Sequence, residues 1–386
     1  MIMLEKVIQY LDNILTSSTP EKPMWNKEAI LEDWTARWNY IDGCMLKAIL
    51  DFYNATKNQK YIEFVDSYVD YYIKDDGSIL GYNVEELNCD HINEGKVLFQ
   101  LFDYTKKEKY KKALDLLYSQ LQMQPRTKSG NYWHKKIYPH QIWLDGLYMV
   151  QPFLLEYDRR YRGFEGYRDV FQQFEFVYHT MRDQQTGLMY HGYDETKSMF
   201  WANPQTGLSP SFWTRSQGWY AMALVDTIET MDEQYFFEYQ SLQQYLKSIL
   251  DALLKVQDDK TQMFYQVSDQ GHREGNYLET SGSCAIAYAL MKGSRLGYVP
   301  SYYYDYGLQI YEAVSKDKLY EENGSIHLGD ICLIAGLGGM PGMGDYKLRD
   351  GSYEYYISEP IVEDDAKGVA PFLFSAAQVI MGTESI

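Results

Sequence analysis

Apolar residues recur at helical spacing along most of the chain. In long stretches the positions three and four residues apart are apolar, which is typical of amphipathic or buried helices. The clearest predicted helices span Tyr61 to Ile73, Lys96 to Tyr104, Trp213 to Met231, Leu242 to Gln257 and Cys284 to Gly293. The pattern therefore predicts a fold that is mostly α-helical.

A short element of a different kind recurs between these stretches. Each copy has a turn residue followed by alternating apolar and polar residues, as in DDGSILGYN from residue 75 and QTGLMYHGYD from residue 185. The equivalent turn positions are Gly77, Gly130, Gly187, Gln262 and Gly324, which are 53, 57, 75 and 62 residues apart. Each interval has room for two helices and a loop, so each unit is interpreted as a helical hairpin.

The number of units fits a closed ring. At about 64 residues a unit, the 386 residues make about six hairpins, and a hairpin that cannot bury its apolar face alone must pack on its neighbours. We therefore predict an all-α fold, an (α/α)6 toroid of six helical hairpins with short β-like loop elements. We expect one domain over residues 1–386. The competing architecture is an open solenoid, whose period is shorter and more regular.

Composition and charge limit the function. An apolar share of 45% is enough for a large core, and a net charge of −18 without a long basic run argues against nucleic-acid binding. No run reaches the roughly 18 apolar residues that a membrane span needs. The first residues lack the basic start and continuous apolar stretch of a signal peptide, so we predict a cytoplasmic protein with no membrane contact. The oligomeric state is left open between a monomer and a weak homo-oligomer.

Neither a metal nor a cofactor is expected. The four cysteines lie far apart in the sequence, and no His or Cys cluster has metal-ligand spacing. The glycine-rich stretch from Ala335 to Arg349 lacks the strand before it and the Lys-Ser/Thr ending of a phosphate-binding loop. We interpret this stretch as a mobile or tightly folded loop.

One carboxylate lies among strongly apolar neighbours. Asp145 is part of YPHQIWLDGLYMVQPF, which begins at residue 138. In a helix, its neighbours three and four positions away include Ile142, Tyr148 and Met149, so we expect desolvation to raise its pKa. A raised pKa suits a general acid near neutral pH. The alternative is that Asp145 only caps a helix.

A second carboxylate and two histidines are further candidates. Asp90 precedes another helical stretch and is either its cap or a second acid that raises the pKa of Asp145. His134 and His191 occupy equivalent positions in two of the repeated elements, so we place them on the same rim. The alternative for each histidine is an ordinary polar residue in a surface loop.

An arginine and a tryptophan share a helix face. Arg215 and Trp219 lie four residues apart in SPSFWTRSQGWYAMAL. A planar guanidinium suits a carboxylate, and an indole suits stacking on a sugar ring. The alternative is a surface pair in which the arginine stacks on the tryptophan.

At these residues the chain resembles a known family. It is similar to the unsaturated rhamnogalacturonyl hydrolases of glycoside hydrolase family 105, which are relatives of the unsaturated glucuronyl hydrolases. The matching segments, spread over nearly the whole chain, are RWNYIDG, CDHINEG, YWHKKIYPHQIWLDGLYM, TGLMYHGYDETKSMFWANPQTGLSPSFWTRSQGWY, YLETSGSC and RDGSYEYYISEP. The resemblance implies an (α/α)6 toroid with Asp145 as general acid and base, Asp90 as a second essential carboxylate, and His191 in the catalytic pocket. The implied substrate-binding residues are Tyr40, His134, Lys135, Trp143, Arg215 and Trp219.

The resemblance also implies an activity. It is the removal of a 4,5-unsaturated uronic acid, expected to be galacturonyl, from the non-reducing end of small acidic rhamnogalacturonan saccharides left by a lyase. The alternatives are an unsaturated glucuronyl hydrolase, a toroid glycosidase for saturated sugars, an epimerase that uses both histidines, and a non-catalytic carbohydrate-binding protein. The tail EDDAKGVAPFLF and the insertion GMGDYK before Leu348 depart from the family pattern, which leaves the specificity for the reducing-end sugar open.

Overall fold

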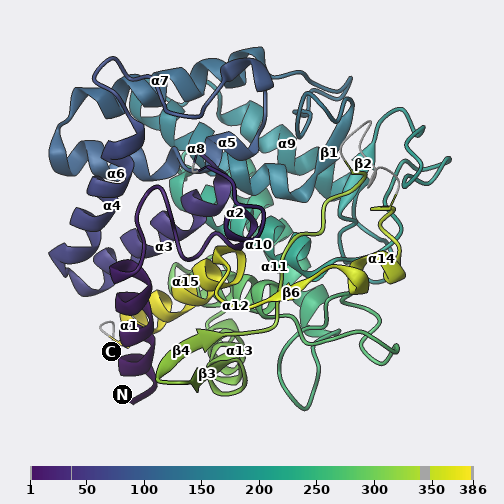
Figure 1. The fold of residues 1–386 in the computed structure, drawn as a ribbon. Helices are drawn as coiled ribbons and strands as arrows, with labels where there is room; N and C mark the ends of the chain where they lie inside the picture. Colours follow the sequence, from purple (N-terminus) through teal and green to yellow (C-terminus); the bar gives the residue numbers. More distant parts are fainter. Residues whose placement is uncertain (1, 36, 340–347, 384–386) are drawn as a thin grey trace.

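The computed structural model describes residues 2–35, 37–339 and 348–383. Its inner helices form a closed ring of six helical layers, one for each hairpin (Figure 1). The ring consists of α3 (Tyr40–Thr56), the pair α5 (Asp90–Asn93) and α6 (Lys96–Thr105), α8 (Leu144–Tyr161), α10 (Thr214–Thr230), α12 (Thr280–Arg295) and α15 (Ala366–Thr383). Each layer packs against the next, and α15 packs back against α3. The predicted (α/α)6 toroid is therefore confirmed.

An outer helix covers each layer of the ring. These helices are α1 (Ile2–Thr16), α4 (Gln59–Tyr72), α7 (Glu108–Met123), α9 (Tyr167–Thr180), α11 (Phe236–Leu254) and α13 (Tyr303–Asp317). The pair of α1 with α15 joins the two ends of the chain and completes the sixth hairpin. Although α10, α12 and α15 are buried on nearly every side, no helix in the described part of the chain is long and apolar enough to cross a membrane.

The repeated turn elements share one backbone conformation. Gly77, Gly130, Gly187 and Gly324 have φ between 80° and 90°, a region that suits glycine because it has no side chain. Gln262 occupies the equivalent position and has a φ of 62° although it carries a side chain. The common positive φ supports the predicted equivalence of the five elements.

Three small two-stranded sheets lie between the helices, in agreement with the predicted β-like loop elements. β1 (Gln141–Trp143) pairs with β2 (Gly192–Asp194), β3 (Leu319–Glu322) with β4 (Ser325–Leu328), and β5 (Ile331–Cys332) with β6 (Ile361–Val362), all antiparallel. In the first sheet Trp143 lies opposite Gly192, and the Leu144 amide donates to the His191 carbonyl over 3.1 Å. This pairing holds the start of α8 beside residue 191.

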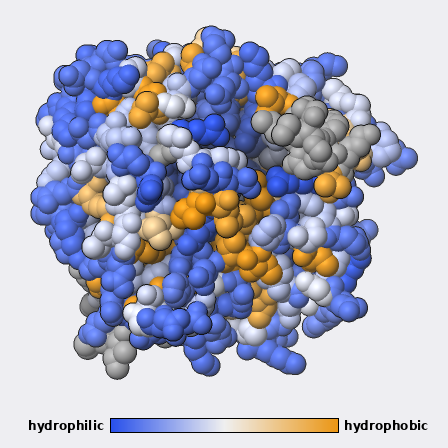
Figure 2. All heavy atoms as spheres, in the orientation of Figure 1, coloured by the Kyte–Doolittle hydropathy of each residue, from blue (hydrophilic) through white to orange (hydrophobic). Residues whose placement is uncertain are grey.

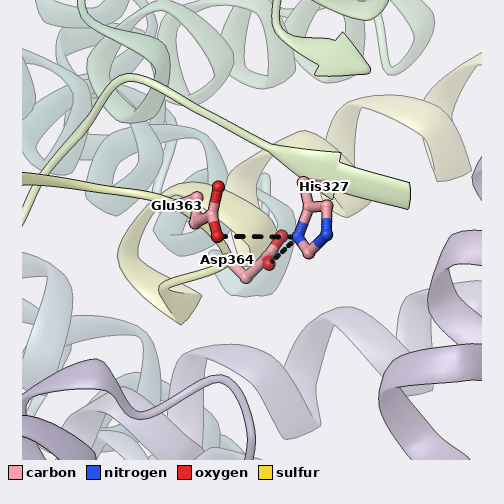
Figure 3. Close-up of side chains that lie close together, drawn as sticks. All are labelled: His327, Glu363 and Asp364. Carbon is pink, nitrogen blue, oxygen red and sulfur yellow. Dashed lines mark hydrogen bonds and ion pairs between the residues drawn. The ribbon is translucent and has the colours of Figure 1, made fainter. Parts of the chain in front are cut away.

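His327, Glu363 and Asp364 form a polar cluster (Figure 3). His327 of β4 has its Nδ1 2.7 Å from Asp364 Oδ2, and the Tyr10 hydroxyl of α1 donates to Asp364 Oδ1 over 2.7 Å. His327, Glu363 and Asp364 form the only group of three potential metal ligands among residues 2–35, 37–339 and 348–383. Because both oxygens of Asp364 already accept hydrogen bonds, we interpret the cluster as a clasp between α1, β4 and the start of α15.

Candidate active site

Two large cavities open at the surface of the described residues. One, of about 520 Å³, lies between α2 (Lys27–Leu31) and β6, where Figure 2 shows apolar surface and where Ile30, Leu31 and Ile361 are exposed. The other, of about 410 Å³, lies at the N-terminal ends of the inner helices. Its lining includes eight of the nine predicted site residues, namely Tyr40, Asp90, His134, Lys135, Trp143, Asp145, Arg215 and Trp219. We therefore place the candidate active site in the second cavity.

The charged site residues lie at the starts of inner helices. Asp90 is the first residue of α5, Asp145 the second of α8 and Arg215 the second of α10. A helix N-terminus carries partial positive charge, which stabilises a carboxylate there and favours an anionic ligand. The alternatives in which each aspartate caps its helix are wrong, because the cap positions are Cys89 and Trp143.

Asp145 faces His191. His191 Nε2 lies 3.0 Å from Asp145 Oδ2, and neither atom has another hydrogen-bond partner among the described residues. Burial alone would raise the pKa of Asp145, but the adjacent His191 and the charge of His134 outweigh burial and lower it. The expected raised pKa is therefore wrong. The helical pattern of the sequence predicts the apolar neighbours of Asp145 on α8. It does not predict the pairing of β1 with β2, which brings His191 to the Asp145 carboxylate.

Asp90 has its own basic partners. Lys135 Nζ lies 2.5 Å from Asp90 Oδ2, and His134 Nε2 lies 3.6 Å from Asp90 Oδ1. Burial opposes ionisation here too, but Lys135 and His134 lower the pKa of Asp90 below its usual range. Burial lowers the pKa of His134 to about 4, which leaves its ring neutral near neutral pH. Asp90 is thus a paired carboxylate, and the expected rise in the pKa of Asp145 does not result from it.

Aromatic rings form much of the cavity wall. Trp143 stacks on both His134 and Tyr138, with centroids 4.5 and 4.9 Å apart, and Trp219 stacks on Tyr148 at 4.9 Å. A Cβ atom at Gly146 would lie only 3.0 Å from His134 Nδ1, which explains the glycine directly after Asp145. The stacking therefore fixes the orientation of both indoles in the wall, where Trp143 is 5% exposed and Trp219 is 2% exposed.

Arg215 is a buried cation held by neutral groups. Its guanidinium donates to the Ser281 hydroxyl over 3.2 Å and to the Cys332 carbonyl, and no carboxylate of the described residues lies within 4.0 Å of it. The side chain is 2% exposed and lies over the ring of Trp213, at 4.6 Å. The alternative of a surface pair with Trp219 is therefore wrong. Glu279 and Asp365 help to stabilise this charge without forming an ion pair with it, so the guanidinium can still bind an anionic group in the cavity.

Residues that the sequence analysis did not single out complete the surroundings of the site. The Tyr356 hydroxyl lies 2.8 Å from His191 Nδ1. Gln266 accepts a hydrogen bond from the indole of Trp213 over 3.1 Å. Gln266 follows its turn residue by four positions, as His191 does, so the repeat could have identified it. Tyr356 comes from 165 positions further along the chain than His191, and no periodicity points to it.

The glycine-rich stretch reaches the mouth of the cavity. Ala335, Gly336 and Arg349 belong to the lining. The predicted mobile or tightly folded loop includes residues 340–347, with the whole insertion GMGDYK, and these lie outside the described residues. The described ends of the stretch lie beside the site.

Comparison with known proteins identifies the family. The model described as Glycosyl Hydrolase Family 88 matches residues 17–383. The structure of a family 105 glycoside hydrolase from C. acetobutylicum ATCC 824 is 44% identical, covers 93% of this chain and 98% of its own, and has a TM-score of 0.86. Protein Atu3128 of Agrobacterium fabrum is 36% identical over 239 residues, 60% of this chain and 99% of that protein. Unsaturated rhamnogalacturonyl hydrolase YesR of Bacillus subtilis is 25% identical over 265 residues, 67% of this chain and 72% of YesR. The resemblance to family 105 is thereby confirmed, and the chain belongs to glycosyl hydrolase family 88.

Proposed function

We propose that the protein removes a 4,5-unsaturated galacturonyl residue from the non-reducing end of small rhamnogalacturonan saccharides. The observation that carries the proposal is the buried guanidinium of Arg215, which forms no ion pair with a carboxylate of the described residues and lies in the same cavity as Asp145, the partner of His191. This arrangement suits a substrate that brings its own carboxylate to a proton donor. The similarity to YesR supports the same class of substrate.

The chemistry follows from the substrate's double bond. In such a sugar C5 carries both the ring oxygen and the double bond to C4, so the group is a vinyl ether. Asp145 donates its proton to C4, which leaves an oxocarbenium ion at C5. Water adds at C5 and returns a proton to Asp145. The resulting hemiketal opens to a ketone at C5, and the hemiacetal at C1 expels the next sugar, so that one water is consumed and the acid is restored.

Substrate binding provides the protonated acid that this step needs. The Asp145 side chain is 16% exposed, and its pKa lies below the usual range. A bound sugar ring would cover that exposed part and exclude water, which raises the pKa of a carboxyl group. Trp143 and Trp219 would stack on the ring, and Arg215 would bind its carboxylate.

Ultraviolet absorbance tests the proposal against its alternatives. Purified protein is mixed with unsaturated disaccharides from lyase-treated rhamnogalacturonan and from lyase-treated glycosaminoglycan, and the absorbance of the conjugated double bond is followed. Loss with the first alone supports the proposal, and loss with the second alone identifies an unsaturated glucuronyl hydrolase. Absorbance that persists with both contradicts the proposal and favours a glycosidase for saturated sugars. Family membership favours an enzyme over the non-catalytic binding protein.

Trp34 is expected to bind the sugar that follows the uronic acid. It lines the cavity mouth with 52% of its surface exposed, whereas the other tryptophans are buried or half-buried. Trp34→Ala should raise KM for an unsaturated tetrasaccharide about 2- to 10-fold and leave kcat unchanged, because a lost ring stack costs about 0.5–1.5 kcal/mol. Initial rates measure both constants. Leu31→Ala, at a more exposed residue of the other cavity, is the control; an equal rise of KM there would refute the assignment.

A further inference from the structure

A chain of three side chains leads from the core to the acid. Tyr356, on α14 (Tyr353–Ser358), has its hydroxyl 2.8 Å from His191 Nδ1, and His191 Nε2 lies 3.0 Å from Asp145 Oδ2. Tyr356 and His191 are both fully buried. The ring of Trp213 lies against both, with centroid distances of 4.8 Å to His191 and 6.0 Å to Tyr356. The imidazole is therefore held in one orientation by aromatic packing and by the hydroxyl.

The hydroxyl determines which nitrogen of His191 carries the proton. Most buried O–H groups donate their hydrogen, and Nδ1 is the only hydrogen-bond partner of the Tyr356 hydroxyl in the described part of the chain. Burial raises the pKa of Tyr356, so the hydroxyl keeps that hydrogen. Nδ1 is then the acceptor, and the single proton of the neutral imidazole lies on Nε2, facing Asp145.

We propose that Tyr356 is a positioning residue that directs the catalytic proton to Asp145 instead of His191. A second proton on His191 would have to bind Nδ1, which would leave the Tyr356 hydrogen buried without an acceptor. The proton therefore goes to the carboxyl group of Asp145. Because Oδ2 is buried against Nε2, the proton is placed on the other oxygen of the carboxyl group, Oδ1. The destination of this proton rests on the proposed function.

His191 Nε2 and Asp145 Oδ2 lie within ion-pair distance, but their geometry is not that of an aligned hydrogen bond. Contacts of this kind often tighten only when the substrate binds. The other titratable or charged groups around the pair come from five neighbouring segments, and they are His134 and Lys135 before β1, Asp90 on α5, Arg215 on α10, Cys332 on β5 and Asp350 before α14. All of these groups stay in place when only the tyrosine hydroxyl is removed, so their effects cancel between the wild type and Tyr356→Phe.

Tyr356→Phe removes the hydroxyl and keeps the ring. We expect kcat to fall about 10- to 100-fold with KM within about 2-fold, because Nδ1 no longer accepts from the hydroxyl and the catalytic proton is no longer confined to Asp145. The kcat optimum should move to lower pH, since a smaller fraction of Asp145 is then protonated at a given pH. Tyr353→Phe is the matched control: its hydroxyl, on the same helix, donates to the carbonyls of Arg273 and Glu274. The control should keep the wild-type pH profile, and an unshifted profile in Tyr356→Phe would overturn the proposal.

Nitrogen-15 NMR of the imidazoles tests the assignment without substrate. The chain has seven histidines, and His191 is identified by the resonance that disappears in His191→Gln. We expect a neutral ring with its proton on Nε2 in the wild type and loss of that state in Tyr356→Phe. A proton on Nδ1 in the wild type would overturn the proposal even if the phenylalanine variant failed to fold. Wild-type protein that left both unsaturated disaccharides intact would refute the proposed function alone, and the tautomer would still decide the role of Tyr356.

Discussion

Asp145→Asn should lower kcat on the unsaturated saccharide by about 10²- to 10⁴-fold, the range that a positioned general acid contributes. The amide has no proton to donate to C4 and cannot accept one from the attacking water. Its oxygen can still face His191 Nε2, so the local geometry and most of the substrate affinity should persist. Loss of double-bond absorbance measures turnover, and isothermal titration measures binding to the inactive variant.

A second aspartate on the same helix supplies the control. Asp158 is buried near the C-terminal end of α8, where its carboxylate accepts from the Gly166 amide over 2.6 Å. An asparagine there keeps an acceptor for that amide, so Asp158→Asn should retain wild-type kcat. If Asp145→Asn retained near-normal activity while folded, Asp145 would not be the proton donor, and Asp90 would be the next carboxylate to test.

Much of the fold could be predicted because the repeat is visible in residues that are close together in the sequence. The helical spacing of apolar residues reports which faces are buried, and a recurrent turn reports the length of a hairpin. The fourth turn has Gln262 where the others have glycine. The spacing and the alternating pattern, and not the residue type alone, therefore identify the repeat. The bounds of the short helix α5 and the pairing of β1 with β2 could not be predicted, because both depend on contacts between distant segments.

The candidate site was predicted less completely than the fold, for a physical reason. The residue types and their positions at helix starts and after turns are local features, and they led to Asp145, Arg215 and His191. Electrostatics is not local: the pKa of Asp145 is lowered by a histidine 46 positions away in the sequence, which arrives through a strand pair. The contact of Tyr356 with His191 is of the same kind. A sequence pattern can identify an acid, whereas the protonation of that acid depends on the assembled ring.

Arg215→Gln should raise KM for the unsaturated disaccharide about 10- to 100-fold and change kcat little. A hydrogen bond to a charged group contributes about 1.5–3 kcal/mol, and each 1.4 kcal/mol corresponds to a factor of ten. The effect should be confined to KM because the substrate carboxylate keeps its charge throughout the reaction, so Arg215 binds ground state and transition state alike. Glutamine retains an amide that can donate to the Cys332 carbonyl, the arginine's present acceptor. Steady-state kinetics with the absorbance assay separates the two constants.

A methyl ester of the same disaccharide tests whether the carboxylate is the group that Arg215 binds. The ester removes the negative charge from the ligand, so the wild-type protein should prefer the acid to the ester by about the factor that the variant loses. Arg215→Gln should bind acid and ester nearly equally. The variant lacks the guanidinium, so removing the charge of the ligand carboxylate breaks no further interaction. Arg37→Met, which removes an exposed cation at the mouth of the same cavity, should keep the preference for the acid. A variant at position 215 that still discriminated fully between acid and ester would assign the carboxylate to another cation, and a loss confined to kcat would instead place Arg215 at the transition state.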